Sequence, residues 1–326
     1  MISHDVVGDS MAGPGIRYLT LARVLARHCP LTFAIPNEPP ASLSSEPFPV
    51  RTYTRRDWTT LEPLTRGQAA LVFPSDIASD FPQLGSLETP LVVDGYDPLM
   101  AEWLAIHAAF PMDTQVAWWK NRQRELGDQL RIGDFFICAS ERQRDWWLGL
   151  LEGAGRINPL TSGQDASLRA LIDVVPYGVD DVPHAGPARN VIRGVWPGIG
   201  AAEKLVLWGG GLWPWLDPQT AIRAMAEVAR VRNDVRLIFP GTRHPNPMLE
   251  GMPTHAPAAR ALADALGLTG RAVLFGDWVP YADWAAVLGE SDLALSLHHD
   301  TYETRLAFRS RMMGYLGAGL PTIATR

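Results

Sequence analysis

The C-terminal stretch from Asp292 to Arg326 constrains the fold more than any other part of the chain. Its segments are, in order, an apolar run at 293–297, a polar loop at 298–303, an amphipathic helix with Leu306, Met313 and Leu316 at roughly helical spacing, and a second apolar run at 322–325. We expect Gly317 and Gly319 to end the helix, and Pro321 prevents its continuation. Strand, loop, helix and strand make a βαβ unit, so this stretch predicts part of a parallel sheet.

Short apolar runs alternate with helical segments through the rest of the chain as well. Further strands are predicted at 31–35, 50–53, 69–73, 91–93, 135–139, 173–175, 205–208, 235–239 and 273–275. The stretch 180–200 is rich in Pro, Gly and Ala and is the best linker candidate. We therefore predict an α/β protein with two Rossmann-like domains, residues 1–185 and 186–326, whose polar loops face one another across a cleft.

Two features lie where such sheets bind ligands, beyond the carboxyl ends of strands. Glu303 stands in the polar loop after the run at 293–297. The turn from Gly13 to Gly15 precedes a predicted helix, whose free backbone N–H groups suit an anion. For Glu303, a solvated loop acid or a helix N-cap remains open as an alternative, and for the glycines an ordinary βα turn does. The dinucleotide pattern G-x-G-x-x-G is absent, since Tyr18 stands where its third glycine would fall.

Composition excludes several other classes of protein. The chain has 326 residues, of which 47% are hydrophobic and 20% charged, so it can bury a real core. Its net charge of −6 argues against a dedicated nucleic-acid binder. No apolar run approaches the ~20 residues that span a bilayer. The histidines lack the spacing of a zinc site, so no metal is predicted. Cys29 and Cys138 are expected to be buried free thiols, which fits a cytoplasmic protein.

Several motifs, taken in their order along the chain, resemble the GT-B fold glycosyltransferases of family 4, also called glycosyl transferases group 1. They are the glycine loop 8–15, the Pro176–Val179 stretch, the glycine turn after 205–208, the segment Gly276–Pro280, and the block from Glu303 to Thr325. The last block is the most specific, because it ends in Ala-Gly-Leu-Pro-Thr-Ile-Ala-Thr. The resemblance covers nearly the whole chain.

The resemblance implies a retaining, metal-independent transfer of a sugar from a nucleotide-sugar, in a cleft between the two domains. The nucleotide-sugar is then a substrate, and no separate cofactor is expected. The departing diphosphate needs anion stabilisation, which helix N-termini, glycine N–H groups and arginines can supply. In this family Glu303 would lie near the donor sugar, as the catalytic residue, and Val279 and Tyr281 near the nucleobase. The other candidates are Gly210, Gly211, Thr242, Arg243, His299, Arg305 and Arg309 on the donor side, and Gly13, Gly15, Arg17 and Asp94 on the acceptor side of the cleft.

The chain also departs from the family pattern. The second acid of the family motif is replaced by Gly314, or by Arg311 if the position is counted from Glu303. The loop after 205–208 lacks the usual Arg and Lys for the diphosphate. These departures leave open a catalytically silent nucleotide- or sugar-binding module. A sugar-nucleotide epimerase is a further alternative.

The sequence says less about the ends of the chain and about the chemical class of the acceptor. The first strand is short and the chain stops at Arg326 as a strand finishes, which predicts a fragment or shortened form with an incomplete C-terminal part. The acceptor could be a glycan, a lipid or a small molecule. Lys120, Arg122 and Arg124 beside Trp118-Trp119 leave open peripheral contact with the inner membrane face, although a solvated helix face explains them equally well.

Overall fold

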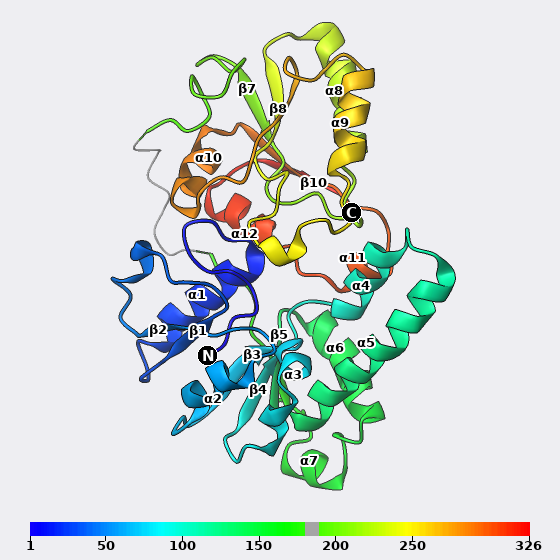
Figure 1. Ribbon diagram of the computed structural model, residues 1–326. Helices are drawn as coiled ribbons and strands as arrows, with labels where there is room; N and C mark the ends of the chain where they lie inside the picture. The colour runs from blue at the N-terminus through cyan, green and yellow to red at the C-terminus, as the bar shows by residue number, and fades with distance from the viewer. Residues whose placement is uncertain (180–188) are drawn as a thin grey trace. The chain divides into compact units, whose positions relative to one another are not determined.

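The computed structural model describes residues 1–179 and 189–326, and these residues divide into two units (Figure 1). Unit 1 comprises Met1–Tyr177 and Leu306–Phe308, and unit 2 comprises Gly178–Arg305 and Arg309–Arg326. The predicted domain boundary between residues 185 and 186 lies outside the described residues and stays a prediction.

The strands of unit 1 are all parallel. They are β1 (Phe33–Ile35), β2 (Val50–Thr52), β3 (Leu71–Pro74), β4 (Leu91–Asp94), β5 (Phe135–Cys138) and β6 (Ile172–Val174). β1 pairs with β2, and the other four pair in the order β3-β4-β5-β6. Ile2 joins the two groups, because it forms a parallel bridge to Ala34 and donates its backbone N–H to Val72 O at 2.8 Å. The first residues therefore act as the central strand of a doubly wound sheet.

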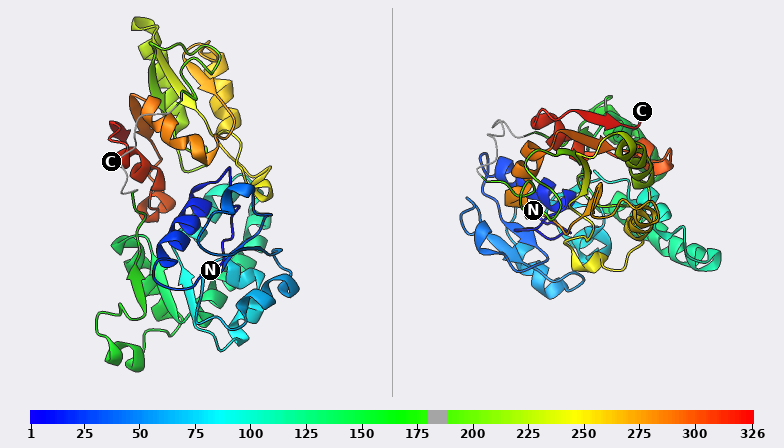
Figure 2. Two further views of the ribbon diagram at one scale, coloured as in Figure 1. Left: turned by 90° about the vertical axis from the view of Figure 1, so that its left-hand side faces the viewer. Right: turned by 90° about the horizontal axis from the view of Figure 1, so that it is seen from above.

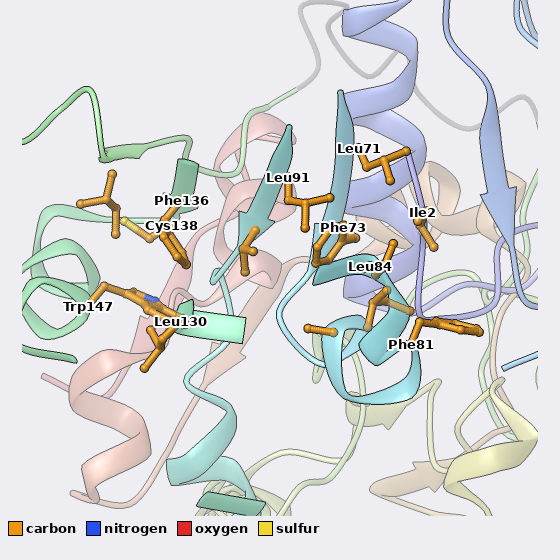
Figure 3. Close-up of a cluster of buried hydrophobic side chains, with 14 of the residues drawn as sticks. Ile2, Leu71, Phe73, Phe81, Leu84, Leu91, Leu130, Phe136, Cys138 and Trp147 are labelled. Carbon is orange, nitrogen blue, oxygen red and sulfur yellow. The ribbon is translucent and has the colours of Figure 1, made fainter. Parts of the chain in front are cut away.

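Helices pack around this sheet and close its core. They are α1 (Gly13–Leu25), α2 (Trp58–Thr65), α3 (Ile77–Asp80), α4 (Leu99–His107), α5 (Met112–Ile132), α6 (Glu141–Gly153) and α7 (Pro159–Gln164), with short 3₁₀ turns η1 (Ala41–Leu43) and η2 (Pro82–Ser86). Figure 3 shows the core, where Phe73, Phe136 and Trp147 are almost fully buried. Pro111 directly precedes the first residue of α5 and separates this helix from α4. The α4–α5 hairpin extends outward from the body of unit 1 (Figures 1 and 2).

Unit 2 carries a second parallel sheet, with strand order β11-β10-β7-β8-β9. The strands are β7 (Lys204–Leu207), β8 (Val235–Phe239), β9 (Val273–Phe275), β10 (Leu293–Ser296) and β11 (Thr322–Ala324). The helices are α8 (Pro218–Val231), α9 (Ala256–Ala265), α10 (Trp284–Glu290), α11 (Tyr302–Leu306) and α12 (Ser310–Gly317), with 3₁₀ turns η3 (Pro247–Leu249) and η4 (Tyr281–Asp283). The predicted α/β class and the strands predicted from apolar runs are confirmed in both units.

The predicted linker is in part a piece of the unit 2 core. Residues 180–188 of it lie outside the described residues. Val191, Ile192 and Ile199, however, are buried against β7 and α10 residues. The buried carboxylate of Glu290 accepts the backbone N–H groups of Val191, Ile192 and Arg193 at 2.5–3.2 Å. The Pro- and Gly-rich composition of this stretch does not predict the anchoring, because the anchoring residue, Glu290, lies about a hundred positions away at the end of α10.

Two further expectations from the sequence are wrong. Cys29 is exposed, and only Cys138 of the two thiols is buried. The single helix expected from Leu306 to Leu316 is two helices, α11 and α12, separated by residues 307–309. The break coincides with Leu306 and Phe308 packing in unit 1, where Leu306 O accepts Gln143 Nε2 at 3.0 Å and Phe308 stacks on Tyr177.

Candidate functional site

Strand order in unit 2 places one candidate site at the junction of β7 and β10. β8 and β9 lie on one side of β7, whereas β10 and β11 lie on the other. The chain leaves β7 and β10 in opposite directions at this junction, and in sheets of this kind ligands bind beyond the carboxyl ends of the strands at such a point. The glycine turn Gly209–Gly211 follows β7, and His298 and His299 follow β10.

The glycine turn is held by aromatic side chains. Gly209 donates its backbone N–H to the buried Tyr315 hydroxyl at 2.8 Å. A methyl group at Gly209 would lie 2.6 Å from that hydroxyl oxygen and 3.1 Å from the Trp284 ring, so no side chain fits there. Gly210 has φ +95°, a left-handed conformation that favours glycine. Both glycines are therefore required by the local geometry.

Glu303 lies in helix α11 and not in a solvated loop. Its side chain is 1% exposed, and its two carboxylate oxygens accept Arg309 Nη1 at 2.8 Å and Arg309 Nη2 at 2.7 Å. The open alternative of a solvated loop acid is thereby excluded. This bidentate, charge-assisted pair fixes the guanidinium plane of Arg309.

Arg311 is a second cation of the same site. A methyl group built on Gly210 would lie 3.5 Å from Arg311 Nη2, so the guanidinium lies against the glycine turn. Its central carbon lies 5.7 Å from the centre of the Trp208 ring, in cation–π range. Burial lowers the pKa of Arg311, and the charge of Arg309 lowers it further. The site therefore concentrates positive charge away from water.

Three buried nitrogen atoms at this site have no hydrogen-bond partner among the described residues. They are Arg309 Nε, Arg311 Nη1 and His298 Nδ1. Burial lowers the pKa of His298, and the neighbouring charges of Arg309 and Arg311 lower it too. Buried polar atoms are almost always paired in folded proteins. A cluster of unpaired nitrogens that includes two guanidinium groups is suited to an anion with several oxygen atoms.

The other predicted phosphate-side residues are less central. Arg243 is exposed and pairs with Glu250 at 2.8 Å, and Arg305 is exposed beside Asp300. His299 is also exposed, whereas the neighbouring His298 carries the buried nitrogen. The structure thus pairs Arg309 with Glu303 and places Arg311 against Gly210, whereas Arg243 and Arg305 stay at the surface.

Of the two predicted nucleobase residues, Val279 lines an open pocket beside β9 and Tyr281 does not. The volume of the pocket is about 540 Å³, and its walls include Trp196, Phe275, Trp278, Val279 and Pro280. Thr242 joins the loop after β8 to the loop after β9. Its hydroxyl donates to Gly276 O at 2.9 Å and accepts from Arg260 Nη2 at 2.9 Å. Tyr281 begins the 3₁₀ turn η4 directly after this wall.

In unit 1, Arg17 and Asp94 form a buried ion pair. Arg17 Nε and Nη2 donate to the two Asp94 oxygens at 2.8 and 3.1 Å, and the two residues are 3% and 1% exposed. These two predicted acceptor-side residues are therefore buried and bound to each other. Gly13 is the first residue of α1, and Gly15 packs so closely that a methyl group would lie 2.3 Å from Val6 O. Gly15 therefore serves close packing.

Sequence reasoning missed a His–Asp pair at the equivalent junction of unit 1. His4 follows the central strand segment, Asp76 follows β3, and His4 Nδ1 lies 2.5 Å from Asp76 Oδ1. Burial alone would lower the pKa of His4, but the Asp76 carboxylate raises it to about 9. Tyr96 OH lies 3.3 Å from His4 Nε2. The one feature of the sequence that could have predicted this pair is the position of its two residues, which come directly after neighbouring strands.

Two absences hold for residues 1–179 and 189–326. No group of three or more His, Cys, Asp or Glu side chains is arranged to hold a metal ion. No helix in this part of the chain is long and apolar enough to cross a membrane.

Solved structures settle the fold. The chain resembles sucrose-phosphate synthase from Thermosynechococcus elongatus, with a TM-score of 0.61 at 13% identity over 99% of this chain and 78% of that one. It also resembles WaaG, a glycosyltransferase involved in lipopolysaccharide biosynthesis, with a TM-score of 0.57 at 16% identity over 98% and 80%. The chain has a GT-B fold. No protein-family model and no curated protein sequence matches it.

A third solved structure extends the GT-B likeness. It is an alpha-glucosyltransferase in complex with UDP and DNA, with a TM-score of 0.53 at 8% identity over 98% of this chain and 78% of that one. At these identities the GT-B likeness establishes the fold, and the narrower family 4 assignment stays a prediction. The function has to be argued from the residues at the sheet edges.

Proposed function

We propose that the protein is a glycosyltransferase that moves a sugar from a nucleotide-sugar donor to an acceptor. The observation that carries the proposal is the set of three buried nitrogens on Arg309, Arg311 and His298, which have no hydrogen-bond partner within residues 1–179 and 189–326. The donor's diphosphate binds there. Its oxygens take the place of the missing partners, and its negative charge offsets that of Arg311, whereas Arg309 is already paired with Glu303.

The same contacts favour the reaction itself. When the bond between sugar and diphosphate breaks, negative charge grows on the diphosphate and positive charge grows on the sugar ring. Fixed guanidinium groups in a buried site stabilise the leaving diphosphate more strongly than water does. Arginine charge thus supplies what a metal ion supplies elsewhere, so the transfer is metal-independent.

Glu303 acts first through Arg309. With both carboxylate oxygens engaged, it fixes the arginine that binds the diphosphate. The direct contact of Glu303 with the donor sugar, and retention of the anomeric configuration, belong to the same proposal. A carboxylate has further lone pairs that can accept a sugar hydroxyl while Arg309 stays bound.

The nucleobase occupies the pocket beside β9. Its aromatic wall and the Val279–Pro280 backbone suit a flat base, and its volume of about 540 Å³ is within the range of small-molecule sites. The acceptor is a glycan, a lipid or a small molecule. UDP is bound by one GT-B neighbour, so UDP-sugars are the first donors to test.

A turnover assay tests this function. The protein is incubated with UDP-, GDP- and ADP-sugars and a panel of acceptors, with and without a metal chelator, and the release of nucleoside diphosphate is measured. At least one donor should be turned over regardless of the chelator, and Arg311→Met should lower the rate more than tenfold. Arg230→Met, which alters an exposed arginine of α8, is the matched control.

A catalytically silent binding module is the second candidate, and one observation favours it. Gly314, where the family's second acid is expected, lies near Trp284 and Leu288 and offers no polar group. Nucleotide-sugar binding by calorimetry without turnover of any donor would support the module and contradict the transferase. Turnover would exclude the module.

A further inference from the structure

The α4–α5 hairpin of unit 1 ends in an aromatic cluster. Trp103 stacks on His107 at 4.2 Å between ring centres, and Trp103 lies 5.6 Å from Trp119. The ring centre of Trp118 lies 5.5 Å from that of His107 and 5.3 Å from that of Phe110. These contacts between the two helices hold the end of the hairpin in one conformation, so its outer side chains are preorganised.

The outer side of this end is apolar and exposed. We define the hairpin tip by five large hydrophobic side chains that are 37–70% exposed: Leu104, Phe110, Met112, Val116 and Trp118. All five lie within one short part of the chain, whereas the other exposed hydrophobic residues are scattered. Single exposed hydrophobic residues need no explanation, but a group of them gathered in one hairpin indicates a surface that binds something.

Beyond the tip, the cationic side chains of Lys120 and Arg124 lie on the exposed side of α5. Met112, Val116, Lys120 and Arg124 recur every four residues, and all four are exposed. Residues 112–125 carry three cationic side chains and two carboxylates, and Arg122 pairs with Glu125 at 3.1 Å, which leaves Lys120 and Arg124 as the cations of this face. Lys120 and Arg124 lie about 12 and 18 Å from Met112 along the helix axis.

We propose that the hairpin tip docks on a membrane surface that contains anionic lipids. Met112, Val116 and the tip aromatics enter the boundary between headgroups and acyl chains, to a depth of about 5–10 Å. With α5 inclined to the surface, Lys120 and Arg124 then lie at the level of the lipid phosphates. Trp118 suits this position, because tryptophan is enriched where one end of a side chain is apolar and the other is wet.

The shape and charge of the surface favour a lipid over a protein partner. The tip is the end of a projecting hairpin (Figure 2), and a bilayer accommodates a projecting apolar end without needing a complementary groove. The cations match the negative surface potential of an anionic leaflet, against the negative charge of the protein as a whole.

Vesicle co-sedimentation with the full chain tests the proposal. The vesicles contain phosphatidylcholine alone or phosphatidylcholine with phosphatidylglycerol. Wild-type protein should bind the anionic vesicles, and added salt should weaken the binding. Met112→Ser/Val116→Ser and Lys120→Glu/Arg124→Glu should each weaken it by roughly tenfold or more.

Matched controls alter the same residue types elsewhere. Leu160→Ser/Val231→Ser removes two side chains that are 84% and 82% exposed, and Arg223→Glu/Arg271→Glu reverses two exposed cations. Both controls should bind as wild type does. The proposal is overturned if wild-type protein ignores anionic vesicles, if the controls lose as much binding as the tip variants, or if the tip instead drives self-association in analytical ultracentrifugation.

Discussion

Arg309 binds both carboxylate oxygens of Glu303, at 2.8 and 2.7 Å, while its own buried Nε has no partner in the part of the chain that the structure describes. Glu303 therefore fixes the orientation of Arg309 but does not satisfy its Nε. Since α11 supplies the acid and the residue before α12 supplies the arginine, the break between these helices creates the geometry. A continuous helix through residues 302–317 would not place these two side chains in this way.

Removing the charge of Glu303 should loosen Arg309. Glu303→Gln leaves a buried guanidinium poorly paired, so we expect the free energy of unfolding to fall by about 1–3 kcal/mol. Donor affinity should fall as well, because Arg309 is no longer held in place. Chemical denaturation and calorimetry measure the two effects, and Glu227→Gln, at an exposed pair, is the control. If turnover falls while UDP affinity is unchanged, Glu303 contacts the sugar and does not position Arg309.

A side chain at Gly209 should displace the glycine turn. Gly209→Ala places a methyl group 2.6 Å from the Tyr315 hydroxyl, and such overpacking typically costs about 1–3 kcal/mol. We expect weaker donor binding together with this lower stability. Tyr315→Phe removes the oxygen that clashes, so Gly209→Ala/Tyr315→Phe should regain part of the loss. A double variant no more stable than Gly209→Ala would show that the hydroxyl is not the obstacle. Gly149→Ala, with no atom within 4 Å of the added methyl, is the control.

Breaking the buried pair of unit 1 should be costly. Asp94→Asn leaves Arg17 charged and buried with one carboxylate missing, so we expect a loss of about 3–5 kcal/mol in unfolding free energy. Arg17→Met/Asp94→Leu removes both charges and should be markedly more stable than Asp94→Asn. Thermal unfolding of the three proteins measures this. Equal stability of the single and the double variant would mean that the uncompensated charge is not what destabilises Asp94→Asn.

The His4–Asp76 pair should make stability depend on pH. The folded-state pKa of His4 is about 9, above its unfolded value of about 6.5. The stabilisation is therefore fully present below about pH 6.5 and is lost as the pH rises through 9, by up to about 3 kcal/mol. The difference in unfolding free energy between wild type and His4→Gln should shrink over this window. A difference that stays constant from pH 6 to pH 9.5 would contradict the assigned shift.

The sequence predicted the strands well because each is a short apolar run buried in a parallel sheet. Leu293–Ser296 and Val235–Phe239 illustrate this, since local composition alone marks them. Position after a strand was likewise enough to select Gly210 and Glu303. The GT-B resemblance drawn from the order of the motifs agrees with the fold of the solved neighbours.

The sequence could not show which of several neighbouring polar residues enters the site. His298 and not His299 carries the buried nitrogen, and Arg311 lies against the glycine turn while Arg305 stays exposed. These choices depend on the helix break at residues 307–309. The break accompanies the packing of Leu306 and Phe308 in unit 1, against residues more than a hundred positions away. The hydrophobic periodicity of a segment cannot predict contacts with residues so distant in the sequence.

Calorimetric titration of nucleoside diphosphates tests the central claim most directly. UDP, GDP and ADP are titrated into wild type, Arg311→Met and the control Arg230→Met. We predict that at least one diphosphate binds to wild type and to the control with equal affinity, and that Arg311→Met weakens this binding more than tenfold. If no diphosphate binds to the wild type, or if Arg311→Met binds as tightly as the wild type, the buried cations of unit 2 are not a donor site.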